Sequence, residues 1–259
     1  LYPFKTTFYE KLGYGNAKGY TLYEFDISDL RFSRPRTGRM TRFQGEPEQA
    51  QSFYEIRELF HRRYDFSLWS KPKEPDELLK SLKEENQFLY QLFDKNRKSL
   101  SYIRYKIDTE NGVRVIFVSD AGWKGREGFL AILNHLYLHA DQCERVSWEG
   151  PPGMTIPYYI PGYSFKVRQK YHWMARPIHV KKLLTVLLSL AEEPVEIEFS
   201  LRDPLLEENT RLYAISGNKI STSDYDPGKD IPFSLFSSLI SGGIHPAAGA
   251  FIEDIPEDV

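Results

Sequence analysis

The first fifteen residues constrain the fold more than any other part of the chain, because they combine aromatic residues with a proline and two glycines. Phe8–Leu12 forms a short amphipathic stretch with helical spacing. Gly13 and Gly15 can adopt the backbone conformations that end such a helix in a tight turn. Tyr20–Phe25 then alternates like a strand. The opening segment therefore predicts a short helix, a glycine turn and a strand.

The middle of the chain mixes helical and extended patterns. Apolar residues at three- and four-residue spacing predict helices, and runs of alternating or β-branched residues predict strands. Asn111-Gly112 is a strong hairpin signal between two of these strands. The helices are expected over residues 46–63, 75–83 and 125–140, and the strands over 88–93, 100–107, 113–118 and 146–148. Helices, a strand meander, and then a helix and a strand indicate an α+β fold with a mixed sheet.

From residue 172 the pattern changes. The cleanest helical stripe of the chain lies over residues 180–190, and Val195–Leu201 alternates apolar and polar residues as a half-buried strand does. A strand over 173–178, a hairpin around Ser216-Gly217-Asn218 and a short helix over 233–240 complete this region. It is expected to form a separate domain.

Composition limits the classes of function. The chain of 259 residues exceeds one typical domain, and 41% hydrophobic and 27% charged residues fit a globular protein with a core. The net charge of −2 excludes a general basic field for nucleic acid. One cysteine, Cys143, excludes an internal disulfide and fits a reducing compartment, so the cytoplasm is the expected location. No stretch of ~18 apolar residues predicts a membrane span.

Several polar groups are candidate sites, and each has a structural alternative. His135 and His139 have the i, i+4 spacing of two zinc ligands, but no third ligand is evident, so no metal site is predicted. Lys124–Gly128 opens a helix and is the nearest match to a phosphate-binding turn, although a simple helix start explains it as well. The Arg-rich stretch 33–45 is either a solvated connection or an anion-binding patch. The tyrosines at 158, 159 and 163 could line a cleft or seal a domain boundary.

The segment Phe8-Tyr9-Glu10-Lys11-Leu12-Gly13-Tyr14 resembles the signature in the last helix, turn and strand of a GNAT acetyltransferase domain. The whole chain is similar to the Eis-like acetyltransferases, the enhanced intracellular survival family. In that family two GNAT-type domains precede a domain similar to sterol carrier proteins. Met174-Ala175-Arg176 matches the entry strand of that last domain.

The resemblance implies a domain organisation. Residues 1–33 would be the C-terminal remnant of a first, catalytic GNAT domain, and residues 34–171 a second GNAT-type domain without a cofactor site. Residues 172–259 would form the sterol-carrier-protein-like α/β sandwich domain. On this interpretation the chain is a fragment that lacks most of the first domain and is inactive alone.

The resemblance also implies an activity. The protein would transfer acetyl from acetyl-CoA directly to a primary amine, such as an aminoglycoside or a lysine side chain, with Tyr9 as the general acid. The main cofactor turn would lie upstream of Leu1, so the cofactor-binding residues are unknown. Family members are thought to use the terminal carboxylate as the base, but the ending at Val259 departs from the family pattern, and Val259 is not assigned this role. A homo-oligomer is implied as well.

Two further functions stay open. The region from residue 172 could be a lipid carrier if its helix left an apolar tunnel beside the sheet. Alternatively, the chain could serve as a scaffold for an oligomer.

Overall fold

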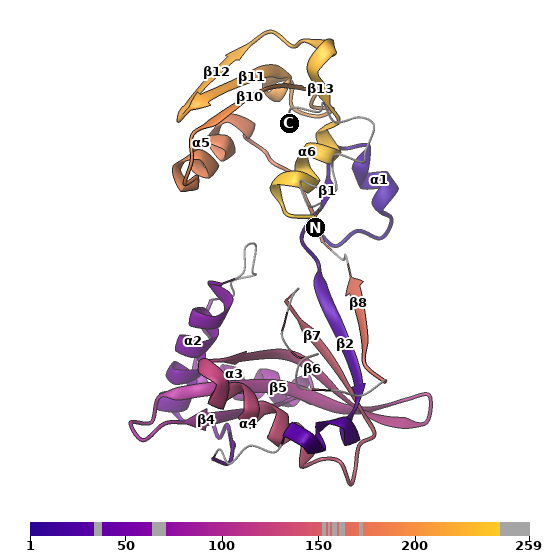
Figure 1. The fold of residues 1–259 in the computed structure, drawn as a ribbon, viewed down its shortest axis with the longest axis vertical. Coiled ribbons are helices and arrows are strands. Elements are labelled where there is room, and N and C mark those ends of the chain that lie inside the picture. The colour runs from indigo at the N-terminus through magenta and orange to yellow at the C-terminus, as the bar shows by residue number, and fades with distance from the viewer. Residues whose placement is uncertain are drawn as a thin grey trace. The chain divides into compact units, whose positions relative to one another are not determined.

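The computed structural model of the chain describes residues 1–33, 38–63, 71–151, 154, 156, 160, 164–170 and 173–243. These residues form two units (Figure 1). The first unit combines residues 1–19 with the described part of 171–259. The second unit comprises residues 20–170.

The second unit contains a mixed sheet of seven strands in the order β3-β4-β5-β6-β7-β2-β8. All neighbouring strands are antiparallel except β6 and β7, which are parallel. The strands are β2 (Tyr20–Asp26), β3 (Thr41–Arg42), β4 (Phe88–Phe93), β5 (Ser99–Glu110), β6 (Val113–Trp123), β7 (Arg145–Gly150) and β8 (Lys166–Lys170).

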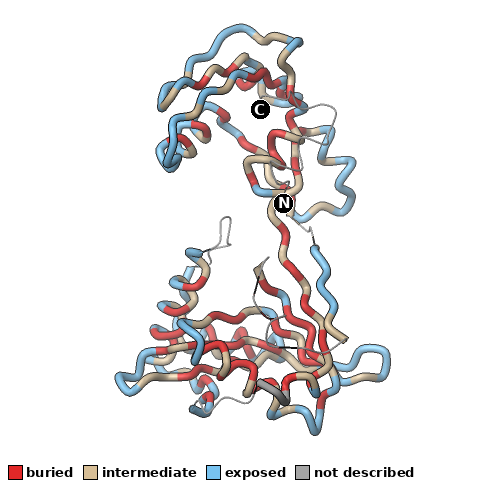
Figure 2. The backbone as a smooth tube through the Cα atoms, in the orientation of Figure 1, coloured by how far each residue is buried: buried red, intermediate tan, exposed pale blue. Residues whose placement is uncertain are grey.

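Helices cover both faces of this sheet. Apolar residues of α2 (Pro47–His61) and α3 (Pro75–Glu84) share a core with Leu89 and Tyr102 on one face. Residues of α4 (Gly125–Tyr137) pack with Ile103 and Trp148 on the other. In Figure 2 the central strands are accordingly coloured mostly red, which marks buried residues. A 3-10 helix, η1 (Ile27–Ser33), follows β2.

The predicted helices and strands of the middle region are confirmed, with small differences at their ends. Pro75 stands at the start of α3, where its missing N–H costs no hydrogen bond. Asn111 and Gly112 have φ angles of 52° and 80°, as a two-residue type I′ hairpin requires. The stretch expected to be only a connection, 33–45, contains the short edge strand β3.

The strand β2 does not follow the predicted boundary at residue 33. It lies between β7 and β8 in the sheet of the second unit, whereas residues 1–19 group with the C-terminal region. The physical reason is visible in its burial pattern: Thr21, Tyr23 and Phe25 are buried on one face, and the backbone pairs on both sides. One continuous segment therefore contributes to both units.

The first unit has a sheet of four strands in the order β12-β11-β10-β13 and a separate pair of strands, β1 and β9. Its helices are α1 (Thr6–Glu10), α5 (Val180–Leu190) and α6 (Phe233–Ile240), with 3-10 helices η3 (Glu207–Asn209) and η4 (Pro227–Lys229). Its strands are β1 (Gly15–Asn16), β9 (Met174–Ala175), β10 (Val195–Leu201), β11 (Arg211–Gly217), β12 (Lys219–Ser223) and β13 (Asp230–Ile231). The expected strand over 173–178 is thus only two residues long.

The apolar stripe of α5 packs onto the sheet of the first unit. Val180, Leu184 and Leu188 are buried in one cluster with side chains of β10, β11 and α6. The rings of Phe199 and Tyr213 stack with their centroids 5.6 Å apart, and Phe199 lies 5.6 Å from Phe236. Phe199, Tyr213 and Phe236 belong to the same apolar cluster as the stripe of α5.

The observed architecture confirms the predicted α+β class with a mixed sheet. Within the described parts of the chain, no helix combines the length and apolar character that a membrane crossing requires.

Candidate functional site

Tyr9 lies in the last turn of the short helix α1, which buries none of its residues. Its side chain is half-buried among Phe4, Phe8 and Tyr14, with ring centroids 5.5, 5.2 and 5.8 Å away. All three contacts are edge-on, a favourable geometry for aromatic pairs. No described residue forms a hydrogen bond with the Tyr9 hydroxyl, so that group is available to a ligand.

The helix differs from the prediction in two respects. It begins at Thr6 rather than at Phe8, and it has no buried apolar face, because none of its residues is buried and Phe8 is 51% exposed. The exposed α1 is visible in Figure 2. Its position must therefore come from the turn that follows it.

The glycine turn after α1 is held by α6. Gly13 has a φ of +82°, and a Cβ there would lie 2.8 Å from a ring carbon of Phe233. A Cβ on Gly15 would lie 2.2 Å from the backbone nitrogen of Ser238. The Ser237 hydroxyl donates a hydrogen bond to the Gly13 carbonyl at 2.7 Å. Gly13 is thus required by its turn conformation and by the approach of Phe233, and Gly15 by the close approach of the α6 backbone.

A buried ion pair fixes the same turn. The Arg176 Nε donates to the Leu12 carbonyl at 2.8 Å, while a terminal nitrogen of Arg176 pairs with Asp203. Both side chains are almost fully buried, with exposed fractions of 4% and 0%. The Arg176 guanidinium also lies over the Phe233 ring, 5.2 Å from its centroid.

The carboxylate of Asp203 is itself fully engaged. It accepts hydrogen bonds from the backbone N–H groups of Leu205 and Leu206 at 2.8 and 3.0 Å, and from the Asn209 amide at 2.8 Å. A buried ion pair needs such additional partners to offset its desolvation. The C-terminal region therefore positions the turn from which the Tyr9 helix projects.

A second place of interest is where the parallel strands β6 and β7 separate. They pair only from Val115–Val118 with residues 145–148, and beyond that β6 follows β5 while β7 follows β2. Ligands often bind at the carboxyl ends of parallel strands at such a point. Here the rings of Trp123, Phe129 and Trp148 pack together, with centroids 4.7 to 6.5 Å apart. Aromatic packing occupies this place.

The stretch Lys124–Gly128 at the start of α4 is a helix start. A Cβ on Gly128 would lie 2.4 Å from the Leu100 carbonyl oxygen, so this glycine is needed for the packing of α4 on β5. The Lys124 N–H donates to that same carbonyl at 2.8 Å. These contacts explain why a glycine stands at position 128 without a need for a bound phosphate. The start of α4 is therefore not assigned as a site for the coenzyme A pyrophosphate.

Sequence reasoning missed a charged network between α2 and β6. Asp120 accepts hydrogen bonds from Arg57 Nε at 2.8 Å and from the Tyr102 hydroxyl at 2.9 Å, and its other contact is His61 Nε2 at 3.1 Å. Burial opposes ionisation of Asp120, yet hydrogen bonding and charge from His61 and Arg57 hold its pKa below the usual value. Burial and the Asp120 charge raise the pKa of Tyr102 well above its ordinary value. The residues are far apart in sequence, so no local spacing signals the network.

His135 of α4 and His139, just after the end of that helix, lie on the same side, as their spacing predicts, and His135 is buried. The Tyr105 hydroxyl lies 3.1 Å from His135 Nε2 and 3.0 Å from His139 Nε2. Burial, with smaller effects from the charges of His139 and Arg39, lowers the pKa of His135 to about 3. Burial also lowers the pKa of His139. No cluster of three potential metal ligands occurs among the residues that the structure describes.

We expect the buried His135 to make stability depend on pH. The folded protein keeps this imidazole neutral, whereas the unfolded chain protonates it below pH ~6.5, so stability falls as the pH drops from ~6.5 toward 3. Between pH 7 and pH 5 this histidine should account for a loss of about 2 kcal/mol in the free energy of unfolding. Urea unfolding across this range should show a flatter pH profile for His135→Gln. The exposed His179, changed to Gln, is the matched control and should leave the profile unaltered.

The remaining residues that the sequence singled out are Cys143, the Arg-rich stretch, the tyrosines at 158, 159 and 163, and Val259. Cys143 is buried and unpaired in the described residues, and burial raises the pKa of its thiol. Arg34, Arg36, the tyrosines at 158, 159 and 163, and Val259 lie outside the described residues. Arg42 stacks over the Phe88 ring at 4.9 Å, a structural use of one member of the Arg-rich stretch.

The fold built by these elements is that of the GCN5-related N-acetyltransferase class. One similar solved structure is a GCN5-related N-acetyltransferase from Anabaena variabilis, with a TM-score of 0.69 and 18% identity over 98% of this chain. Another is a probable N-acyltransferase from Enterococcus faecalis, with a TM-score of 0.71 and 15% identity over 97% of this chain. A third is Eis1 from Mycobacterium abscessus, with a TM-score of 0.64 and 18% identity over 94% of this chain.

The chain spans 65%, 64% and 63% of the lengths of these three structures, respectively. No protein-family model matches the sequence, and no curated protein is significantly similar to it. The comparisons therefore establish the fold.

Proposed function

We propose that this protein acts in acetyl-CoA-dependent transfer of acetyl to a primary amine, with Tyr9 as the general acid. The observation that carries the proposal is the placement of the Tyr9 hydroxyl. It stands on a half-buried ring with no protein partner among the described residues, at a turn anchored by the buried Arg176–Asp203 pair. A phenol that is held in position and has no hydrogen-bond partner in the protein can donate its proton to a bound ligand.

The chemistry assigns Tyr9 one task. When the amine attacks the thioester carbonyl, the carbon–sulfur bond breaks and the sulfur leaves as a thiolate. Tyr9 would donate its phenolic proton to that sulfur, since phenols and thiols in general have proton affinities close enough for such transfer. The amine loses its own proton to a base that we do not assign.

Two places in the second unit where cofactor phosphates could be expected have other structural uses. The start of α4 is used for packing against Leu100, and the gap where β6 and β7 part is occupied by the rings of Trp123 and Trp148. This supports the proposal that the unit containing β6 and β7 is a GNAT-type domain without a cofactor site. It also supports a cofactor site formed elsewhere in the whole protein.

A direct test is amine-dependent release of coenzyme A thiol from acetyl-CoA by the whole protein. One aminoglycoside and one lysine-containing peptide should be offered as acceptors, and mass spectrometry should find one added acetyl group on the accepted amine. Thiol release that needs an amine would support the proposal. If neither amine is acetylated and no thiol appears, the acetyltransferase assignment is wrong.

Lipid carriage has less support. The buried residues of the α5 stripe belong to one apolar cluster with Phe199 and Tyr213 of the sheet. The homology of this unit to sterol carrier proteins and the assembly of the protein into oligomers stay predictions, the latter open to light scattering.

A further inference from the structure

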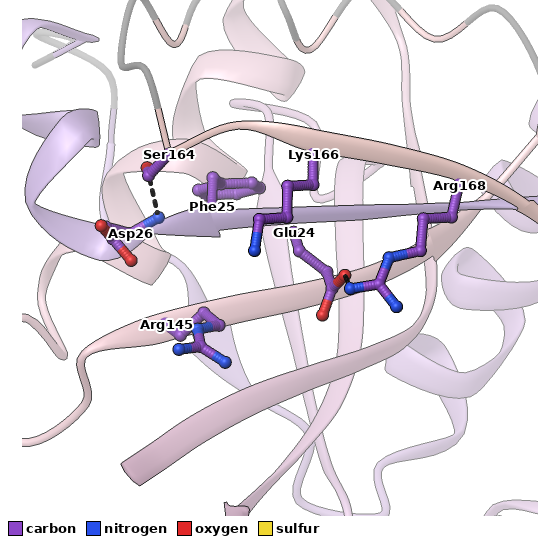
Figure 3. Close-up of a pocket in the computed structure, with 7 residues that line it drawn as sticks. All are labelled: Glu24, Phe25, Asp26, Arg145, Ser164, Lys166 and Arg168. Atoms are coloured by element: carbon purple, nitrogen blue, oxygen red, sulfur yellow. Dashed lines mark hydrogen bonds and ion pairs between the residues drawn. The ribbon is translucent and has the colours of Figure 1, made fainter.

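The strands β7, β2 and β8 of the large sheet carry a charged pocket that the proposed acetyl transfer does not use. The pocket has a volume of about 250 Å³ and lies over β7, β2 and β8 (Figure 3). Its charged lining residues are Glu24, Asp26, Arg145, Lys166 and Arg168. Three of the five are cations, which gives the lining a net positive charge.

The strand register places these charges together. Glu24 and Asp26 alternate with the buried Tyr23 and Phe25 on β2, so they lie on the face opposite the core. Asp26 is directly across from Arg145 on β7, and Glu24 is across from Lys166 on β8. As Figure 3 shows, the cations of β7 and β8 therefore lie on either side of β2.

Only one of the three cations is neutralised within the pocket. A terminal nitrogen of Arg168 lies 2.9 Å from a carboxylate oxygen of Glu24. In the part of the chain that the structure describes, neither Arg145 nor Lys166 has an ion-pair partner within 4 Å, although Asp26 and Glu24 are their cross-strand neighbours. Unpaired cations that share one hollow attract an anion, and an arginine beside a lysine suits an oxyanion with several acceptor oxygens.

One wall of the pocket is held in place. The Ser164 hydroxyl donates to Asp29 at 2.5 Å and accepts a hydrogen bond from the Asp26 N–H at 3.2 Å. This fixes the segment that leads into β8, and with it the strand that carries Lys166 and Arg168. The pocket is thus preorganised on one side, while Arg145 on the other side is half-buried and Lys166 and Arg168 are exposed.

We propose that this pocket binds a small molecule bearing a phosphate or carboxylate group, held by Arg145 and Lys166 with Arg168 retained by Glu24. The inference does not depend on the proposed acetyl transfer, since the two concern different units of the chain.

The test is an NMR titration of the isotope-labelled protein at constant ionic strength, with inorganic phosphate, succinate and chloride as separate probes. Phosphate or succinate should shift the amide signals of β2, β7 and β8 in a saturable manner, and chloride should not. Whichever probe saturates at the lower concentration identifies the class of oxyanion. Shifts no larger than those with chloride would overturn the proposal.

Three variants extend the test, and two of them should change the binding affinity in opposite directions. The double variant Arg145→Gln/Lys166→Gln should weaken binding at least about tenfold, because charge-assisted contacts are lost. Glu24→Gln should tighten it several-fold, because a negative charge leaves the pocket. Lys95→Gln, an exposed position in the same unit, should bind as the parent does. If the double variant does not fold, Glu24→Gln alone still decides: unchanged or weaker binding contradicts the inference.

Discussion

Replacing Tyr9 with phenylalanine should lower kcat for acetyl transfer by about 100-fold or more, since positioned acids typically contribute 10²–10⁴-fold. The substitution removes only a hydroxyl that has no partner among the described residues. The edge-on ring contacts with Phe4, Phe8 and Tyr14 are kept. The thermal unfolding midpoint should therefore stay unchanged, which separates chemistry from folding. Steady-state kinetics of the whole protein provide the measurement.

Tyr14→Phe is the matched control, because it deletes the same group from the neighbouring ring, 5.8 Å away. It should keep nearly full turnover. A second control varies the leaving group: with an acetyl thioester of a more acidic thiol, which leaves without protonation, the defect of Tyr9→Phe should shrink. Equal turnover for Tyr9→Phe and the parent would remove Tyr9 from the mechanism, and a defect independent of the thiol would argue against proton donation.

Changing Asp203 to asparagine should destabilise the first unit by about 3–5 kcal/mol, because it leaves the buried Arg176 charge without its counter-ion. The amide oxygen can still accept from the Leu205 and Leu206 N–H groups, so the variant loses the charge and the one acceptor that binds Asn209. Hydrogen-exchange mass spectrometry should show faster exchange in peptides from residues 1–19 and 173–243. Peptides from the second unit should exchange as in the parent.

The exposed ion pair Lys229–Glu198 serves as the control, because an exposed ion pair contributes little to the free energy of unfolding. Its side chains are 44% and 43% exposed, so Glu198→Gln should cost no more than about 1 kcal/mol. Arg176→Met and the double variant with Asp203→Asn complete a cycle in which the two losses should not add. An Asp203→Asn protein as stable as Glu198→Gln would show that the buried pair does not hold the unit together.

These two predictions are linked through the turn at Leu12 and Gly13. Arg176 binds the Leu12 carbonyl, and Ser237 binds the Gly13 carbonyl. Asp203→Asn should therefore also reduce acetyl transfer, and this loss should be accompanied by faster hydrogen exchange in residues 1–19. Tyr9→Phe should reduce transfer with no such change.

Most regular elements of the chain could be predicted from the sequence, because their signals are local. The stripe over α5 and the alternation of β10 depend on neighbours a few positions away, and Asn111-Gly112 specifies its own turn. The resemblance that singled out Tyr9 was carried by a few consecutive residues. The start of α1 was placed too late because Thr6 and Thr7 give no apolar signal.

The site around Tyr9 was only partly predictable. Its glycines predict a turn, but no neighbouring residue in the sequence indicates that Phe233 and Ser238 pack against them. Arg176 is part of a sequence motif, but no local pattern pairs it with Asp203, which lies 27 positions away. The Asp120 network was missed for the same reason, since His61 and Asp120 lie 59 positions apart.

By itself the sequence determined most of the helices, the longer strands and the tight turn at Asn111-Gly112, since those depend on side-chain periodicity and on the φ angles that glycine and asparagine allow. Tertiary structure alone decided that residues 1–19 pack with the C-terminal region, that β2 enters the other sheet, and that His135 is buried against Tyr105. The physical reason is separation along the chain. The bond from Ser237 to Gly13 joins residues 224 positions apart, and its donor and acceptor meet only when hydrophobic packing and strand pairing bring them together.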